Sequence, residues 1–140
     1  MPFLNPRPAI TLTESDSERL ALLAGQIRPR QPEVAALLDS EIDRAAIVAP
    51  QSVPADTVTM RSHVVFGYGH TQRPHWLTLV YPGEADLDQK KISVATPVGA
   101  ALIGLAEGQS IGWTLPSGEE RRITLHKVAY QPERAGCYDR

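Results

Sequence analysis

The sequence is poor in cysteine and has no long apolar run. Its 140 residues contain one cysteine, Cys137, which cannot form an internal disulfide. This composition is typical of a reducing compartment and predicts a cytoplasmic protein. No stretch approaches the roughly 20 consecutive apolar residues of a membrane-spanning helix. Apolar residues nevertheless make up 42% of the chain, which is enough for a packed core.

An excess of basic residues is also lacking. The chain carries 14 Lys and Arg against 16 Asp and Glu, a net charge of -2 and a pI of about 6.1. Proteins that bind duplex nucleic acid usually have a high pI and a clustered basic patch. We therefore expect no direct contact with nucleic acid, so that any role in nucleic-acid metabolism would run through a protein partner.

Motifs for metal, cofactor or covalent chemistry are missing as well. None of the four histidines, His63, His70, His75 and His126, is paired at helical i, i+4 spacing, and Cys137 has no neighbouring ligand residue. Zinc sites usually draw closely spaced Cys and His ligands. Gly67-x-Gly69 lacks the third glycine of a dinucleotide-binding turn. We expect no metal, no cofactor and no catalytic residue.

The first third of the chain has the pattern of two short helices. Thr13 or Ser15 can cap the first helix, with Ser15 and Glu18 spaced as a capping box. One apolar stripe precedes Pro29, and a second begins after Pro32, a favoured first-turn position. The stripes consist of Leu20, Leu23, Ala24 and Ile27, then Ala35, Leu38, Ile42 and Ala45. Two stripes separated by about four residues predict an antiparallel hairpin with helices of about 14–16 residues, reaching about 21–24 Å.

The remainder has strand patterns broken by Gly and Pro. A linker is expected at residues 49–54, which contain two prolines. Strands are expected at 57–60, 63–66, 75–81, 92–94, 111–115 and 122–128, with a turn at 116–119 between the last two. Thr96 and Pro97 would cap and begin one short helix, ended by Gly104. The prediction is an α+β protein: residues 1–50 form an arm and a short helical hairpin or coiled coil, and residues 51–140 form an antiparallel β domain with one short helix.

Several segments carry a family resemblance. The run from Ile92 to Leu105 resembles the strand, Ser/Thr-Pro turn, helix and glycine of Gre-type transcript cleavage factors. Within that family, the regulators of nucleoside diphosphate kinase are more similar still. The segments that carry this resemblance are 41–45, 54–60, 78–82, 97–102 and 130–133, and together the match runs from about Thr11 to the end.

The resemblance implies an FKBP-like C-terminal domain and a cytoplasmic, monomeric, non-catalytic transcription regulator. Such a protein would bind RNA polymerase near its secondary channel, compete with the Gre cleavage factors and regulate expression of nucleoside diphosphate kinase. By the same resemblance, Thr96, Pro97 and Val98 would contact the polymerase. An exposed helix N-terminus can also accept a partner's carboxylate.

The chain departs from the cleavage factors at the tip of the hairpin. Those factors carry acidic residues on a long coiled coil, where carboxylates help to hold magnesium. Here the tip contains Arg28, Arg30 and Glu33, the arm is short, and we expect no stimulation of cleavage. The arginines could meet an acidic partner surface or simply be solvated. Asp39, Glu41 and Asp43 are expected on a solvated helix face.

Two alternatives remain open. An FKBP-like fold would permit prolyl isomerase activity, but the predicted short helix has no aromatic residue for a pocket floor. Trp76 and Trp113 lie on predicted strands and are expected in the core or half-buried. The second alternative is an interaction module for another protein. Turnover of a proline peptide, or binding to core polymerase, separates these alternatives from the leading hypothesis.

Overall fold

A computed structural model describes residues 7–114 and 117–138 of the chain. The helices are α1 (Glu14–Ile27), α2 (Pro32–Arg44) and α3 (Pro97–Leu102). The strands are β1 (Thr11–Thr13), β2 (Ala46–Val48), β3 (His63–Tyr68), β4 (Pro74–Val80), β5 (Lys91–Ser93), β6 (Ser110–Thr114) and β7 (Glu120–Tyr130). Short 3-10 turns occupy Pro50–Ser52, Pro82–Glu84 and Leu87–Gln89.

The two N-terminal helices form the predicted antiparallel hairpin. Helix α1 begins at Glu14, and the Thr13 side chain accepts a hydrogen bond from the Asp16 N–H. The cap at Thr13 is therefore confirmed, and the one at Ser15 is wrong because Ser15 already lies inside the helix. Four residues join α1 to α2, which begins at Pro32 as expected. Leu20, Leu23, Ala24, Ala35 and Leu38 are buried along the two stripes.

A small parallel sheet lies at the base of the hairpin. Strand β1 enters α1 and strand β2 leaves α2, with Thr11 opposite Ala46 and Thr13 opposite Val48. Neither strand is among those expected from the sequence, because three residues are too few to show alternation. The Thr11 N–H also donates to the Gly104 carbonyl, 3.2 Å away, so this sheet contacts the end of α3.

The C-terminal part is a curled five-stranded sheet with strand order β5-β4-β3-β7-β6. Three neighbouring pairs are antiparallel, as predicted, while β4 and β5 run parallel. The predicted strand at 57–60 is wrong: apart from one bridge between Thr57 and Ala106, the N–H groups of this segment bond to loop carbonyls and to side chains. Residues 115–119 connect β6 to β7, and of these the structure describes 117–119; Leu115 and Pro116, the first residue of the predicted turn, lie outside the described residues.

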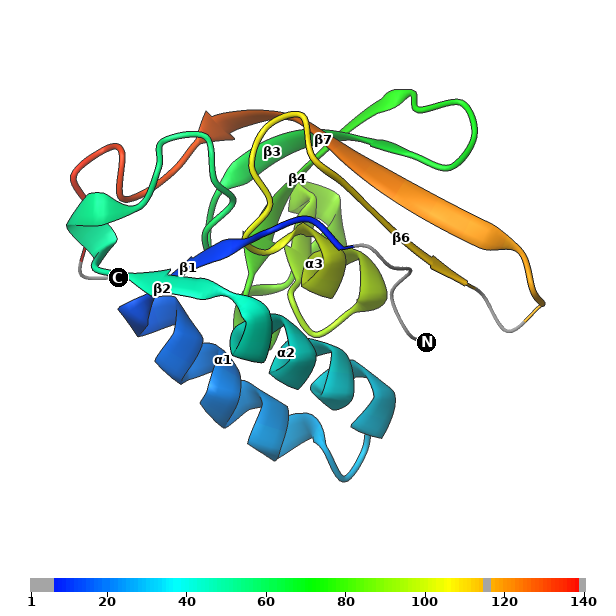
Figure 1. Cartoon of the computed structure of the whole chain (residues 1–140), viewed down its shortest axis with the longest axis horizontal. Helices are drawn as coiled ribbons and strands as arrows, with labels where there is room; N and C mark the ends of the chain where they lie inside the picture. The colour runs from blue at the N-terminus through cyan, green and yellow to red at the C-terminus, as the bar shows by residue number, and fades with distance from the viewer. Residues whose placement is uncertain (1–6, 115–116, 139–140) are drawn as a thin grey trace.

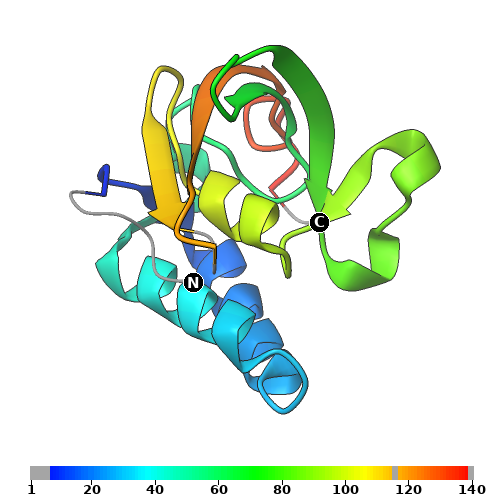
Figure 2. The ribbon, with the colours of Figure 1, turned by 90° about the vertical axis from the view of Figure 1, so that its right-hand side faces the viewer.

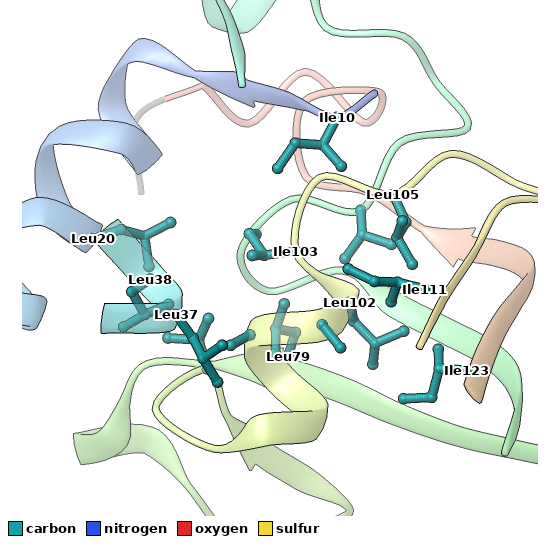
Figure 3. Close-up of a cluster of buried hydrophobic side chains, with 14 of the residues drawn as sticks. Ile10, Leu20, Leu37, Leu38, Leu79, Leu102, Ile103, Leu105, Ile111 and Ile123 are labelled. Carbon is teal, nitrogen blue, oxygen red and sulfur yellow. The ribbon is translucent and has the colours of Figure 1, made fainter. Parts of the chain in front are cut away.

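Helix α3 lies between the sheet and the hairpin (Figure 1). The view from the side shows α3 inside the curl of the sheet, with the hairpin below it (Figure 2). Leu20 and Leu38 of the hairpin belong to the same buried cluster as Leu102, Ile103 and residues of the sheet (Figure 3). The core is thus continuous across the predicted linker.

Candidate partner-binding surface

The start of α3 is held in a fixed turn. The Thr96 hydroxyl donates to the Ser93 carbonyl at 2.8 Å and accepts from the Gly99 N–H at 3.1 Å. A Cβ at Gly99 would lie 2.4 Å from the Ser93 carbonyl oxygen, so only glycine lets α3 approach the end of β5 this closely. These contacts place Thr96, Pro97 and Val98 in a half-buried turn open to a partner.

The turn offers fewer amide donors than the sequence suggested. Proline has no N–H, and the Gly99 N–H is used by the Thr96 cap. Of the first three residues of the helix, only Val98 keeps an N–H for a partner. Recognition by side chains must therefore supply most of the contact at this turn.

A shallow apolar groove lies beside Val98. This hollow measures about 350 Å³ and lies between α3, the strands β3, β4 and β5, and the loop before β5. It is lined by Val98 from α3, Phe66 from β3, His75, Trp76 and Leu77 from β4, Ile92 from β5, and Leu87 and Lys90 from the loop. We call it the Trp76 groove. Trp76 and Leu87 are 56% and 79% exposed. Neighbouring large apolar side chains open to solvent typically mark an interaction site.

A lysine covers part of the exposed indole. The Lys90 ammonium lies 5.3 Å from the centre of the Trp76 ring, in the geometry of a cation–π contact. The aromatic rings of Phe66 and His75 also form a pair, with their centres 5.6 Å apart. The groove therefore combines an aromatic floor with a positive charge at its edge.

Sequence reasoning missed this groove. Trp113 is buried in the core as expected, but Trp76 is neither in the core nor half-buried. Its strand begins with three exposed residues, Pro74 to Trp76, before the buried part of β4. The sequence offered one indication of an interaction site here, which is the apolar Leu87 in a mostly polar loop. Only the tertiary fold brings Leu87 close to Val98.

The residues predicted at the hairpin tip lie apart from the Trp76 groove. Arg28, Arg30 and Glu33 are exposed, and none of them lines the groove. The Arg28 guanidinium donates to the Asp39 carboxylate at 2.8 Å, so part of its charge is already compensated. The candidate residues thus form two separate surfaces, one at the start of α3 and one at the tip.

The prediction of a solvated acidic face on α2 is wrong for Glu41. Its side chain is 1% exposed and accepts hydrogen bonds from Arg44 and from Arg7, 3.1 Å away. Arg44 also donates to the Pro8 carbonyl, and Arg7 to the Ser40 hydroxyl. The Glu41 carboxylate therefore holds Arg7, and with it the segment before β1, against α2. Asp43 is exposed, as predicted, and Asp39 is partly covered.

Two other properties concern the described residues only. Between residues 7 and 138, leaving out 115 and 116, no three His, Cys, Asp or Glu side chains come together in a way that could hold a metal ion. The helices in the same part of the chain fall short of the length and hydrophobicity that a membrane-spanning helix needs.

Comparison with known proteins assigns the class. Residues 53–130 match the family described as "Transcription elongation factor, GreA/GreB, C-term". A solved GreA/GreB elongation factor from Nitrosomonas europaea superposes with a TM-score of 0.69 at 37% identity, covering 86% of this chain and 99% of that one. The chain therefore belongs to the GreA/GreB family of transcription elongation factors.

The N-terminal part places the chain more narrowly. Residues 8–48 match the family described as "Rnk N-terminus". Over 132 residues the chain is 39% identical to the "Regulator of nucleoside diphosphate kinase" of Escherichia coli strain K12, covering 94% of this chain and 97% of that protein. Against the GreA of Chlorobium phaeobacteroides it is 38% identical over 84 residues, about half of that factor's length. The resemblance seen in the sequence is confirmed, and the chain is a transcription-factor-like regulator.

Proposed function

We propose that this protein binds RNA polymerase near the mouth of the secondary channel, competes there with Gre cleavage factors, and thereby regulates expression of nucleoside diphosphate kinase. Membership of the GreA/GreB family supports the choice of partner. The observation that carries the proposal is the Trp76 groove, which places exposed Trp76 and Leu87 beside Val98 at the start of α3. Aromatic side chains in apolar hollows are typical anchors of protein interfaces.

In this proposal the hairpin blocks the site of the cleavage factors but supplies no residues for transcript cleavage. Its helices have 14 and 13 residues, about 20 Å at 1.5 Å per residue. At its tip two arginines accompany Glu33. A magnesium ion needs several oxygen ligands, and this tip does not supply a pair of carboxylates. The protein would therefore exclude cleavage factors without replacing their activity.

A prolyl isomerase is the second candidate, and the aromatic lining of the Trp76 groove favours it. Phe66, His75 and Trp76 could pack against a proline ring. Against it, α3 has the sequence Pro-Val-Gly-Ala-Ala-Leu and contributes no aromatic side chain to the groove. Measured cis/trans exchange of a proline peptide above the uncatalysed rate would favour the enzyme. Polymerase binding without such exchange would favour the regulator.

The Pro97→Glu variant tests the polymerase contact. Glutamate is tolerated in the first turn of a helix, so the variant should keep its fold, as circular dichroism can check. Its charge and length at the docking turn should weaken binding to core polymerase by about tenfold or more, since interface mismatches of this kind cost a few kcal/mol. Affinity would be measured by fluorescence anisotropy and by displacement of a labelled cleavage factor.

A matched control is Ala129→Glu, which adds the same charge at an exposed position of β7. It should bind and compete like the original protein. Equal affinity of the Pro97 and Ala129 variants would contradict the proposed contact, and no binding by the unchanged protein would contradict the proposed function itself.

A further inference from the structure

A second and larger hollow lies at the surface where the hairpin meets the sheet domain. It measures about 530 Å³ and lies between α1 and the turn that follows β4. Arg19, Leu22 and Gln26 line it from α1, and Arg61, Pro82 and Gly83 from the other side. We call it the hairpin groove. None of these residues lines the Trp76 groove, so the two hollows are distinct.

Leu22 gives this groove an exposed apolar edge. The buried stripe of α1 faces α2 and the core, whereas Leu22 lies outside that stripe and is 70% exposed. Contacts within the chain therefore do not account for a leucine at this position. Together with Pro82 across the groove, Leu22 forms an apolar strip that a partner could cover.

Two arginines flank the apolar strip. Arg61 has a φ of 67°, in the left-handed region, and its Nε donates to both Glu84 carboxylate oxygens at 3.1 and 3.0 Å. Within the described part of the chain, the terminal Nη groups of Arg61 and the side chain of Arg19, a residue of α1, have no hydrogen bond. Glu84 thus orients the Arg61 guanidinium and leaves its outer N–H groups available.

The charge of the groove defines what would fit. Among the described residues that line it, two are arginines and none is acidic, although Glu84 beside the groove pairs with Arg61 at 3.0 Å and compensates part of that charge. Guanidinium groups bind carboxylates with paired hydrogen bonds, and such contacts give both strength and orientation. An apolar strip between two arginines therefore matches a helix that presents an apolar side chain flanked by carboxylates.

We propose that the hairpin groove is a second docking site, which takes an acidic amphipathic helix of RNA polymerase. This inference rests on the proposed function. Apolar side chains of that helix would pack on Leu22 and Pro82, and its carboxylates would meet Arg19 and the Nη groups of Arg61. Because the groove is bounded by both the hairpin and the sheet domain, docking there would hold the hairpin in place while the start of α3 is engaged.

Site-specific photo-crosslinking to core polymerase tests the two sites separately. A benzophenone amino acid would replace Leu22, Trp76 or Ala129 in the full chain, each an exposed position that leaves the core intact. We expect cross-links from positions 22 and 76 but not from 129. The polymerase peptide attached at position 22, identified by mass spectrometry, should be helical and rich in Asp and Glu.

The outcomes distinguish the two proposals. A cross-link from position 76 alone, or one from position 22 to a basic or unstructured segment, would overturn the hairpin-groove site and leave the proposed function standing. No cross-link from either position, combined with no binding in solution, would overturn both.

A charge reversal provides an independent measurement. Arg19→Glu should weaken polymerase binding about tenfold at low salt, with a smaller difference at high salt because surface electrostatics are screened. Arg73→Glu makes the same charge change at an exposed loop position outside both grooves and should have little effect. Equal losses for the two variants would show a general charge effect and overturn the site.

Discussion

At the scale of single residues, two glycines in helices have opposite surroundings. Gly99 faces the backbone of β5 and the residue after it, where a Cβ would meet the Ser93 oxygen at 2.4 Å and the Val94 Cα at 2.7 Å. Around a Cβ added at Gly25, in α1, no atom lies within 4 Å apart from its chain neighbours and the backbone of its own helix. The first glycine is required by close packing, whereas the second only weakens its helix.

This contrast predicts opposite effects of the same substitution. Gly99→Ala should lower the free energy of unfolding by about 1–3 kcal/mol, because backbone atoms cannot move aside cheaply. Gly25→Ala should raise it by about 0.5–1 kcal/mol through better helix propensity. Urea denaturation followed by circular dichroism measures both. A neutral Gly99→Ala would show that α3 does not approach β5 as described.

The Gly99 substitution also bears on the docking surface. If it shifts α3 away from Ser93, the Thr96 cap moves with the helix, since both contacts lie in the same turn. Polymerase binding should then fall more than in a variant equally destabilised elsewhere.

At the scale of elements, a buried carboxylate connects α1 to the sheet domain. Asp16 lies in the first turn of α1, and its side chain accepts a hydrogen bond from the Met60 N–H at 3.1 Å. An acidic residue in the first turn of a helix also interacts favourably with the helix dipole. The full burial of Asp16 shows a second role, because it completes the backbone hydrogen bonding of the 57–62 segment.

Asp16→Ala should therefore cost more than its neighbour Glu14→Ala. Losing Asp16 leaves the buried Met60 N–H without its acceptor, which costs about 1–3 kcal/mol. Glu14 is exposed in the same turn, and its loss should cost at most about 0.5 kcal/mol. Both values come from chemical denaturation of the full chain. Similar costs for the two variants would mean that Asp16 acts only through the helix dipole.

Elements with a regular apolar period could be predicted from the sequence, and those defined by tertiary contacts could not. Two stripes and Pro32 were sufficient for the hairpin, and Thr96 with Pro97 for the start of α3. Residues 57–60 alternate like a strand, yet their N–H groups bond to Pro54, Leu105 and side chains. Likewise Glu41 has the spacing of a surface residue, and only the fold brings Arg7 to it.

The same limit applies to the candidate site. Thr96 and Pro97 could be placed because capping is local in sequence. The Trp76 groove joins segments from Phe66 to Val98, and its existence depends on β5 lying parallel beside β4. That parallel pairing follows from the loop that carries Leu87 and Lys90, which no short sequence pattern indicated.

At the scale of the whole molecule, the hairpin and the sheet domain share their core. The sequence predicted separate regions at 1–50 and 51–140, joined by a proline-containing linker. In the structure, α2 packs against α3, and hairpin leucines lie in one cluster with α3 and the sheet (Figure 3). Helices of 13 and 14 residues are marginal alone, so this shared burial stabilises the hairpin.

A shared core predicts a single unfolding transition. In a Trp76→Phe background, fluorescence reports Trp113 in the sheet core, while ellipticity at 222 nm is dominated by the helices, mostly the hairpin. The two signals should have the same urea midpoint.

Leu38→Ala, in the hairpin, should shift both midpoints together and cost about 2–5 kcal/mol, as is usual for a buried leucine. Ala36→Ser, at an exposed position of the same helix, should shift neither by more than about 0.5 kcal/mol. If Leu38→Ala moved the ellipticity transition and left the fluorescence transition in place, the hairpin would be an independent unit, and the hairpin groove would then lie between two bodies free to move relative to each other.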